Sequence, residues 1–412
     1  KLALSCLCIG LTKSLNEFGN KRTIHNIRKF YGLPSTQKQK NMSIQKISYI
    51  IILSLGLLPI ASCQKKEVMP EFYVEISHPD NKYQVTPIKD YILTLEGTPA
   101  GLPYGSSSGR WADSGAMWTE QLGTPIGADI VYYSDYEDVF YHLKVDFPVD
   151  YMKEMTQRAY FIYEPKNFEG SLPQYIDLRE KRSYFSEVNL TARVCNEFDN
   201  LIFGFAPKGM VVVWLGYGPT RIELGRYQAK VVKDEKLIKE YEDRLATMYY
   251  NVSRKDKYEI HKEIYGEETA KATPERWDNY RKKYKLKVVI SSENRGFRLF
   301  SNDIGYFNGE SETVLRPYVI TAKAKECAIP ETFYFIFETA KGASYNCEVF
   351  FDWDKLHTIL EKNPTDEHTL EVKLNATSTD LEVFLDGEPI KTEGQYIREN
   401  EGNFYIFRDS YK

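Results

Sequence analysis

The sequence has little of what marks the common enzyme and metal-binding classes. Its 412 residues include only six histidines and six cysteines. The sequence contains no HExxH motif, no phosphate loop and no dinucleotide-binding motif. No cysteine or histidine spacing is typical of a zinc site, and no two carboxylates can be assigned as acid and base from the sequence. We therefore predict no catalytic residue, no metal and no cofactor, and we favour a non-enzyme while leaving the question open.

Positive charge is also scarce in most of the chain. Lys and Arg number 54 against 58 Asp and Glu, a net charge of −4, and the first 41 residues are strongly basic. The rest, from Cys63 onward, has a net charge of about −12. Nucleic-acid binding needs clustered Lys and Arg, so the composition argues against a nucleic-acid partner. It also argues against a polybasic membrane-binding face.

Long apolar runs are missing except for one, ISYIIILSLGLLPIA at residues 47–61. Lys46 precedes it, and the sequence IASC ends it at Cys63, just before the charged QKKE. The run is short for a spanning helix, which needs about 20 apolar residues. A basic start, an apolar centre and small residues at the end are typical of a signal peptide, and IASC has the form of a bacterial lipobox.

These features predict how the amino-terminal part is processed. We expect residues 1–41 to be an over-extended start without structure and residues 42–62 to be a lipoprotein signal peptide. Residues 63–70 would then be a tether, with Cys63 lipidated and holding the chain to the membrane, because several acyl chains anchor stably. Gln64, where a retention signal would have Asp, favours the outer membrane of a Gram-negative envelope, with the body periplasmic or at the surface.

Only three other cysteines follow Cys63, namely Cys195, Cys327 and Cys347. An envelope location permits disulfides, and the odd number leaves at least one thiol free. A Cys327–Cys347 disulfide is the most plausible pairing. If residues 333–338 and 345–352 form a hairpin, however, the two cysteines do not face each other in it, and the bond would need a third strand that carries Cys327.

The pattern along the chain predicts an α+β fold, predominantly antiparallel β with sandwich-like sheets and a charged helical insertion. Residues 71–232 form a first β-rich region, in which Gly and Pro punctuate runs of aromatic and β-branched residues. Residues 233–285 read as helices, each with an apolar stripe. Residues 286–412 return to strands and form a second β-rich region.

Several local signals are specific. MVVVWLGY, residues 210–217, is continuously apolar and predicts a central strand buried on both faces. Ser253 is a candidate N-cap for a helix that ends near residue 265, and His261 on that helix is expected to be solvated. Asn308-Gly309 and Asp386-Gly387 both predict type I′ hairpins, which need two residues with positive φ.

The longest stretch without periodicity runs from Glu96 to Pro125. It contains Tyr104, Arg110, Trp111 and Trp118, which are residue types enriched in binding hot spots, and long ordered loops often carry binding residues. We predict that these four side chains contribute to a ligand-facing edge. The alternative is that both tryptophans cap the core of the first β-rich region. The same loop contains GSSSG, but without the strand and helix that a nucleophile elbow requires, so we interpret it as a turn.

Four stretches together resemble a known family. They are HPDNKYQV (78–85), PYGSSSGRWADSG (103–115), IVYYSDYEDVFYHLKVDFP (130–148) and GFAPKGMVVVWLGYG followed by RIEL (204–224). The chain resembles, over roughly residues 70–310, the bacterial lipoproteins that carry domain of unknown function 2931. It departs from that family at residues 132–134 and 207–209. The resemblance implies an envelope location and a β-rich architecture, and it assigns no residue a role.

The leading hypothesis for function is a non-catalytic binding lipoprotein that engages an envelope protein or glycan. An immunity lipoprotein that neutralises an interbacterial toxin is one version of it, since some members of the family that the chain resembles belong to such neighbourhoods. The alternatives are an envelope hydrolase whose carboxylates lie on different strands, and a structural subunit of an outer-membrane assembly.

Overall fold

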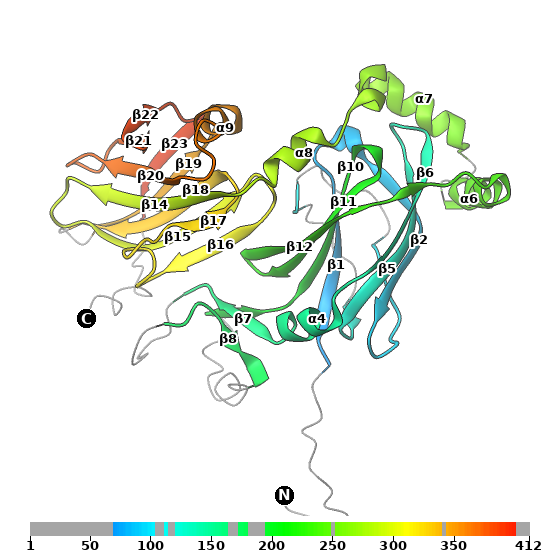
Figure 1. The fold of residues 1–412 in the computed structure, drawn as a ribbon, viewed down its shortest axis with the longest axis horizontal. Coiled ribbons are helices and arrows are strands. Elements are labelled where there is room, and N and C mark those ends of the chain that lie inside the picture. Colours follow the sequence, from blue (N-terminus) through cyan, green and yellow to red (C-terminus); the bar gives the residue numbers. More distant parts are fainter. Residues whose placement is uncertain are drawn as a thin grey trace, which may run out of the picture. The chain divides into compact units, whose positions relative to one another are not determined.

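The computed structural model describes residues 69–103, 111–113, 120–163, 172–179, 194–248, 252–339 and 343–400 (Figure 1). Within these ranges the chain forms four β-sheets and five α-helices, and most strand pairs are antiparallel. The predicted α+β fold with predominantly antiparallel strands is confirmed. The predicted signal peptide and Cys63 lie outside the described residues, and so does most of the predicted tether.

The largest sheet has ten strands, drawn from both β-rich regions of the sequence. Its members are antiparallel to their neighbours except β1 and β10, which run parallel although more than a hundred residues separate them. The order across the sheet is β23 (Gly394–Glu399), β19 (Ser344–Phe350), β18 (Pro330–Glu338), β15 (Arg298–Tyr306), β16 (Ser311–Leu315), β12 (Thr220–Gln228), β11 (Met210–Tyr217), β10 (Asn200–Ala206), β1 (Glu71–Ser77) and β4 (Gln121–Leu122).

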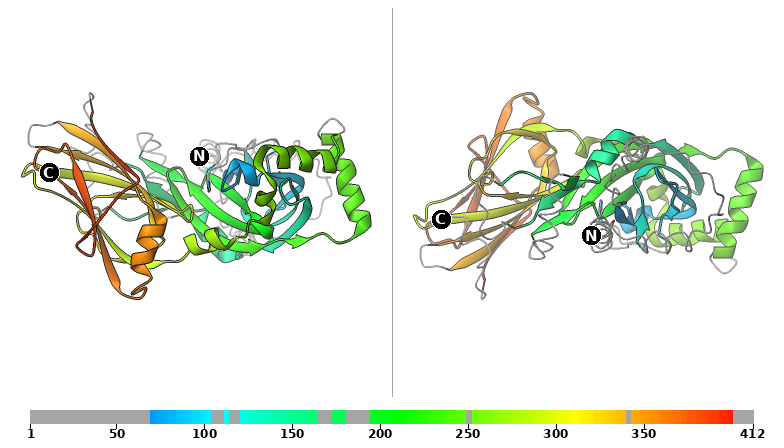
Figure 2. Two further views of the ribbon diagram at one scale, coloured as in Figure 1. Left: turned by 90° about the horizontal axis from the view of Figure 1, so that it is seen from above. Right: turned by 90° about the horizontal axis from the view of Figure 1, so that it is seen from below.

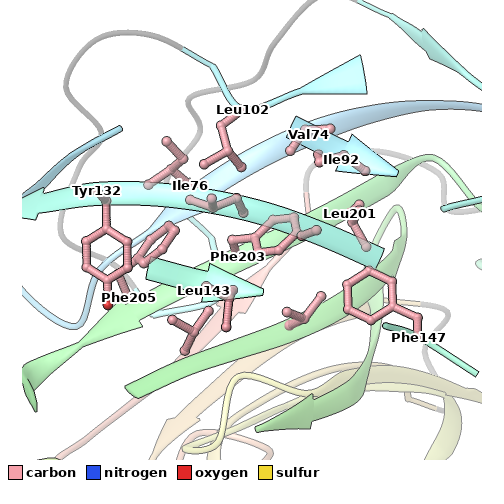
Figure 3. Close-up of a cluster of buried hydrophobic side chains, with 14 of the residues drawn as sticks. Val74, Ile76, Ile92, Leu102, Tyr132, Leu143, Phe147, Leu201, Phe203 and Phe205 are labelled. Atoms are coloured by element: carbon pink, nitrogen blue, oxygen red, sulfur yellow. The ribbon is translucent and has the colours of Figure 1, made fainter. Parts of the chain in front are cut away.

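A five-stranded sheet packs on the β1, β10 and β11 part of this sheet and completes a first sandwich. Its order is β13 (Lys230–Val231), β6 (Val139–Asp146), β5 (Pro125–Ser134), β2 (Val85–Thr94) and β3 (Ala100–Gly101). Figure 3 shows aliphatic and aromatic side chains of both sheets meeting, among them Val74, Ile92 and Phe203. β11 is buried at every position, as its unbroken apolar run predicts.

A second sandwich lies in the carboxy-terminal part of the chain. The strands β15, β18 and β19 share a core with a sheet ordered β17 (Lys325–Cys327), β14 (Tyr284–Ser292), β20 (Glu367–Leu374), β21 (Leu381–Leu385) and β22 (Glu388–Ile390). Helix α9 (Trp353–Leu360) adds Leu356 and Leu360 to that core, and Figure 2 shows it against these strands. Burying one such leucine stabilises the fold by about 1.5–3 kcal/mol.

A three-stranded sheet covers the other face of β15, β16 and β18. It consists of β8 (Ile176–Asp177), β7 (Arg158–Phe161) and β9 (Cys195–Glu197). Its apolar residues share a core cluster with Phe300, Leu315 and Ile336. The short helix α4 (Val149–Met155) leads from β6 into this sheet.

The predicted helical segment is present. It contains α6 (Glu235–Met248), α7 (Arg254–Tyr265) and α8 (Glu275–Tyr280). Ser253 caps α7 as predicted, because its side chain accepts a hydrogen bond from the Asp256 N–H. The expectation that His261 is solvated is wrong. His261 is buried, with Nε2 2.9 Å from the Lys82 carbonyl oxygen, because α7 packs this face against the turn at residues 81–83.

The two predicted type I′ turns differ in outcome. Asp386 and Gly387 both have positive φ, 54° and 84°, as a type I′ hairpin requires. At the other hairpin only Gly309 has positive φ, 88°. There the Tyr306 N–H bonds to the Glu310 carbonyl oxygen, and the turn has three residues closed by a bulge at glycine. This second hairpin leads into β16 and fixes its register.

Candidate functional site

The two halves of the ten-stranded sheet meet at a single residue pair. β12 and β16 are neighbours only at Arg221 and Ser311, and beyond this pair the two strands diverge. The Ser311 hydroxyl also donates a 2.7 Å hydrogen bond to the Pro219 carbonyl oxygen. The divergence opens the sheet at the start of the second sandwich, and the candidate site lies in that opening.

The hairpin of residues 306–310 fixes this junction. Trp214 Nε1 donates to the Asn308 carbonyl oxygen at 3.2 Å, and Arg221 Nε donates to the Gly309 carbonyl oxygen at 3.1 Å. A Cβ added at Gly309 would lie 2.5 Å from the Cβ of Ala112 and 3.0 Å from the indole of Trp214. Only glycine fits this close approach with positive φ, so the sequence Asn308-Gly309 serves the junction as well as the turn.

Beyond the junction lies a cavity of about 580 Å³. One wall comes from β12 and from residues 172–174, and the other from β14, β15 and β16. Residues 316–327 close it on a further side: the Val319 N–H bonds to the Leu315 carbonyl oxygen, and the Tyr318 hydroxyl donates to the Leu172 carbonyl oxygen at 2.9 Å. The volume is within the range of about 300–1,000 Å³ that is usual for ligand sites.

Aliphatic side chains form much of the cavity wall. Val288 and Ile290 come from β14, Ile304 from β15, Val314 from β16 and Val319 from the segment after β16. Ile304 and Val314 lie on one face of the sheet because each alternates with residues of the opposite face. The cavity therefore offers branched apolar surface of the kind that accommodates an aliphatic group.

Two of the three carboxylates that line the cavity are engaged by cations and other donors. Glu312 accepts hydrogen bonds from the Tyr306 hydroxyl and from the Lys325 ammonium. Glu310 forms an ion pair with Lys283 at 3.0 Å, and its other oxygen accepts from the Glu223 N–H at 3.3 Å. Burial raises the pKa of Tyr306 well above its ordinary value, so this phenol stays a neutral donor.

One polar atom of the cavity has no partner. Asn302 in β15 is only 1% exposed, and its Oδ1 accepts no hydrogen bond from any described residue. An unmatched buried acceptor costs about 1–3 kcal/mol, and such an exception needs an explanation. Asn302 lines the cavity, but this oxygen is itself enclosed by protein atoms and does not face the open space. On the opposite face Thr313 Oγ1 donates to Asp303 at 2.6 Å, and burial raises the pKa of that carboxyl.

The edge of β16 is the second unmatched feature. The Tyr306 N–H to Glu310 C=O bond fixes the alternation in the β15–β16 ladder, so residues 312 and 314 bond to β15. Ser311, Thr313 and Leu315 therefore direct their main-chain groups away from β15. Ser311 meets β12, but no described strand pairs with β16 at Thr313. The main-chain N–H and C=O of Thr313 thus face the opening between the strands.

The four residues predicted to form a binding edge can be placed only in part. Tyr104, Arg110 and Trp118 lie outside the described residues. Trp111 is partly buried, and its ring packs edge-on against Trp214 with centroids 5.0 Å apart. It also lies 6.5 Å from the ring of Trp277. This placement agrees with the alternative in which Trp111 caps the core.

The three described cysteines are buried free thiols. Cys327 is in β17, opposite Tyr284, whereas Cys347 is in β19, opposite Phe335 in a different sheet. The structure therefore does not pair them, although a strand other than those of the hairpin does carry Cys327. Burial raises the pKa of Cys195 and that of Cys327 to about 12. Among the residues that the structure describes, no cluster of three or more His, Cys, Asp or Glu could hold a metal.

Sequence reasoning missed the cavity residues. The one local signal was Asn302, an amide at an alternate position with Ile304 and Tyr306 on an otherwise apolar strand face. No local sequence pattern marks Thr313. Its position matters because Ser311, two residues before it, pairs with Arg221 in β12, ninety residues earlier in the chain. No helix in the described part of the chain has the length and apolar character needed to cross a bilayer.

The fold and the cavity define a β-rich protein of two joined sandwiches with a helical segment between them. The family model for proteins of unknown function, DUF2931, matches residues 64–274, and the chain belongs to that family. The match ends before α8, short of the residue 310 that the resemblance suggested. All strands of the second sandwich, which begin with β14 at Tyr284, therefore lie outside the matched part.

Further comparisons add little. No curated protein matches the chain. Two crystal structures of the pilus adhesin SpaC from Lactobacillus rhamnosus GG match at 9% and 10% identity. They cover 78% of this chain, which spans 40% and 41% of the adhesin chains, with TM-scores of 0.12 and 0.11. Scores this low do not indicate a shared fold.

Proposed function

We propose that the chain is an envelope lipoprotein, anchored through Cys63, that binds a protein or glycan partner without catalysing a reaction. The lipobox and apolar run support the anchor, and the cavity between β12 and β16 supports the binding role. A lipid-anchored body with an acidic net charge is suited to engaging neighbours at a membrane rather than nucleic acid.

The observation that carries this proposal is the state of the polar groups in the cavity. Two of its three carboxylates, Glu310 and Glu312, already accept hydrogen bonds from lysines and other donors, and Glu326 alone has no partner among the described residues. A hydrolase with two carboxylates needs one as a proton donor and one as a free base or nucleophile, and a single unengaged carboxylate does not supply that pair. The unpaired Thr313 main chain can form hydrogen bonds but cannot carry out acid–base chemistry. This arrangement favours binding.

A photo-crosslinking experiment tests the proposal in the native envelope. A photoreactive amino acid is placed at Lys323, which is exposed and lines the cavity, and at Glu382, an exposed control on β21 outside the cavity. We expect a defined crosslinked product from position 323 and none from position 382. Identical products from both positions, or none from either, would contradict a binding role for the cavity.

A second experiment tests the alternative that the chain is an envelope hydrolase. The purified lipoprotein is incubated with isolated peptidoglycan. Soluble fragments released by the parent protein, but not by Glu312→Gln or Glu310→Gln, would replace the binding role with catalysis. We expect no fragments, because neither carboxylate is free in the structure.

A further inference from the structure

We propose that the open edge of β16 pairs, main chain to main chain, with a short extended segment of a partner protein whose side chains enter the cavity. The inference rests on the proposed binding role and names the ligand class as a polypeptide rather than a glycan. Addition of a strand to a sheet edge is a common mode of peptide recognition, in which main-chain bonds give affinity and pockets for alternate side chains give specificity.

The hydrogen-bond register identifies which edge is open. On the β12 side of the opening, the Glu223 N–H points towards β16 and already donates to the Glu310 carboxylate. The carbonyl of Leu315, at the end of β16, is bonded to the Val319 N–H. Between these capped positions the N–H and C=O of Thr313 face the opening, and no described strand pairs with them. A segment of about three residues would complete the ladder there.

The cavity supplies the side-chain half of this recognition. A residue of the added strand that points to the inner face would meet Val314 of β16 and the aliphatic side chains behind it. An aliphatic side chain there would pack on the branched walls. Glu310 and Glu312 are already paired with lysines, so this inner part of the cavity does not call for a charged side chain.

A glycan fits this surface less well than a peptide. Sugars present a ring of hydroxyls that need many donors and acceptors, whereas much of the cavity wall is aliphatic and its inner carboxylates are already engaged. Natural proteins usually protect an open strand edge by keeping it short or by placing charge on it. β16 has only five residues, so its open edge can pair with no more than a short segment.

The test uses the full lipoprotein in detergent and a phage-displayed library of random linear seven-residue peptides. The best selected peptide is synthesised unmodified and with one N-methyl group at each position in turn. Only the Thr313 carbonyl is free to accept from the added strand, so N-methylation should weaken binding at least tenfold at the one position whose N–H donates to it and little elsewhere. Failure to select any peptide, or equal sensitivity at all positions, would overturn strand pairing.

Variants of the protein locate the binding. Val314→Trp fills the cavity and should abolish peptide binding, whereas Val231→Trp, at an exposed valine of β13, should leave it unchanged. Thr313→Ala keeps the main chain and should retain affinity within about twofold, while Thr313→Pro removes the edge N–H and should lose it. If Thr313→Pro fails to fold, the N-methyl series still decides, because it alters only the peptide.

Peptide binding that survives Val314→Trp would refute this location. Crosslinking from position 323 to a glycan would refute the peptide class while leaving the proposed binding function intact.

Discussion

Replacing Trp111 with alanine should destabilise the protein by about 2–4 kcal/mol. Its ring packs edge-on against Trp214, which is fully buried, with centroids 5.0 Å apart. A Cβ added to Gly204 would lie 2.9 Å from Trp111, which shows how closely the indole covers that strand. Truncating a buried aromatic residue costs about 3–5 kcal/mol, and partial exposure of Trp111 lowers this value.

The measurement is urea unfolding of the chain from residue 64 onward, followed by far-ultraviolet circular dichroism. The free energies of unfolding are compared only where the two proteins show the same dependence on urea concentration. A change in that slope would mean a changed unfolded state or a loss of two-state behaviour. Tyr91→Ala is the control, since Tyr91 is 57% exposed on β2 and its truncation should change stability by no more than about 0.5 kcal/mol.

The result that would refute this reasoning is equally clear. If Trp111→Ala changes the unfolding free energy by less than about 0.5 kcal/mol and also abolishes capture of a partner, Trp111 is a binding residue. The predicted ligand-facing edge in its loop would then gain support, and the packing described here would be energetically unimportant.

Three further predictions follow from buried or reactive side chains. Burial lowers the pKa of His78 to about 4, below the value of about 6.5 in an unfolded chain, so its contribution to stability is complete above pH 6.5 and is lost as the pH falls towards 4. His78→Gln should therefore reduce the loss of unfolding free energy between about pH 7 and pH 4.5 by roughly 2–3 kcal/mol, and an unchanged pH profile in urea titrations would contradict this. Iodoacetamide should leave Cys195, Cys327 and Cys347 unmodified in the native protein but label all three after unfolding without reductant, because the thiols are buried and unpaired; a single labelled thiol in the mass spectrum would indicate a disulfide. Cys63→Ala should abolish metabolic labelling by a fatty-acid analogue, and equal labelling of variant and parent would disprove lipidation at this residue.

Local sequence signals predicted individual elements well. The unbroken apolar run of β11, the Ser253 cap of α7 and the Asp386-Gly387 turn were all predicted correctly. Each depends on residues within one element, where alternation, capping and positive φ act directly on the main chain. The type I′ prediction at Asn308-Gly309 was wrong because the Tyr306 N–H to Glu310 C=O bond closes a loop of three residues, in which only Gly309 has positive φ.

Long-range pairing was not visible in the sequence. The parallel pairing of β1 with β10, and the single pair between Arg221 and Ser311, join segments about a hundred residues apart. Alternation of apolar residues indicates which face of a strand is buried but does not name its neighbour. The cavity and the open edge at Thr313 arise from that neighbour relationship, so no local pattern could predict them.

The boundary of the family match bears on where specificity lies. Residues 64–274 include β12 and the strands of the first sandwich, but β14, β15 and β16 lie beyond them. The cavity therefore has one wall inside the matched part and one outside it. A chain that ended near residue 274 would keep the edge of β12 but lose Glu310, which caps the Glu223 N–H, and would lose Thr313 altogether. The proposed peptide edge is thus a property of the second sandwich, which lies beyond the part of this chain that the family model matches.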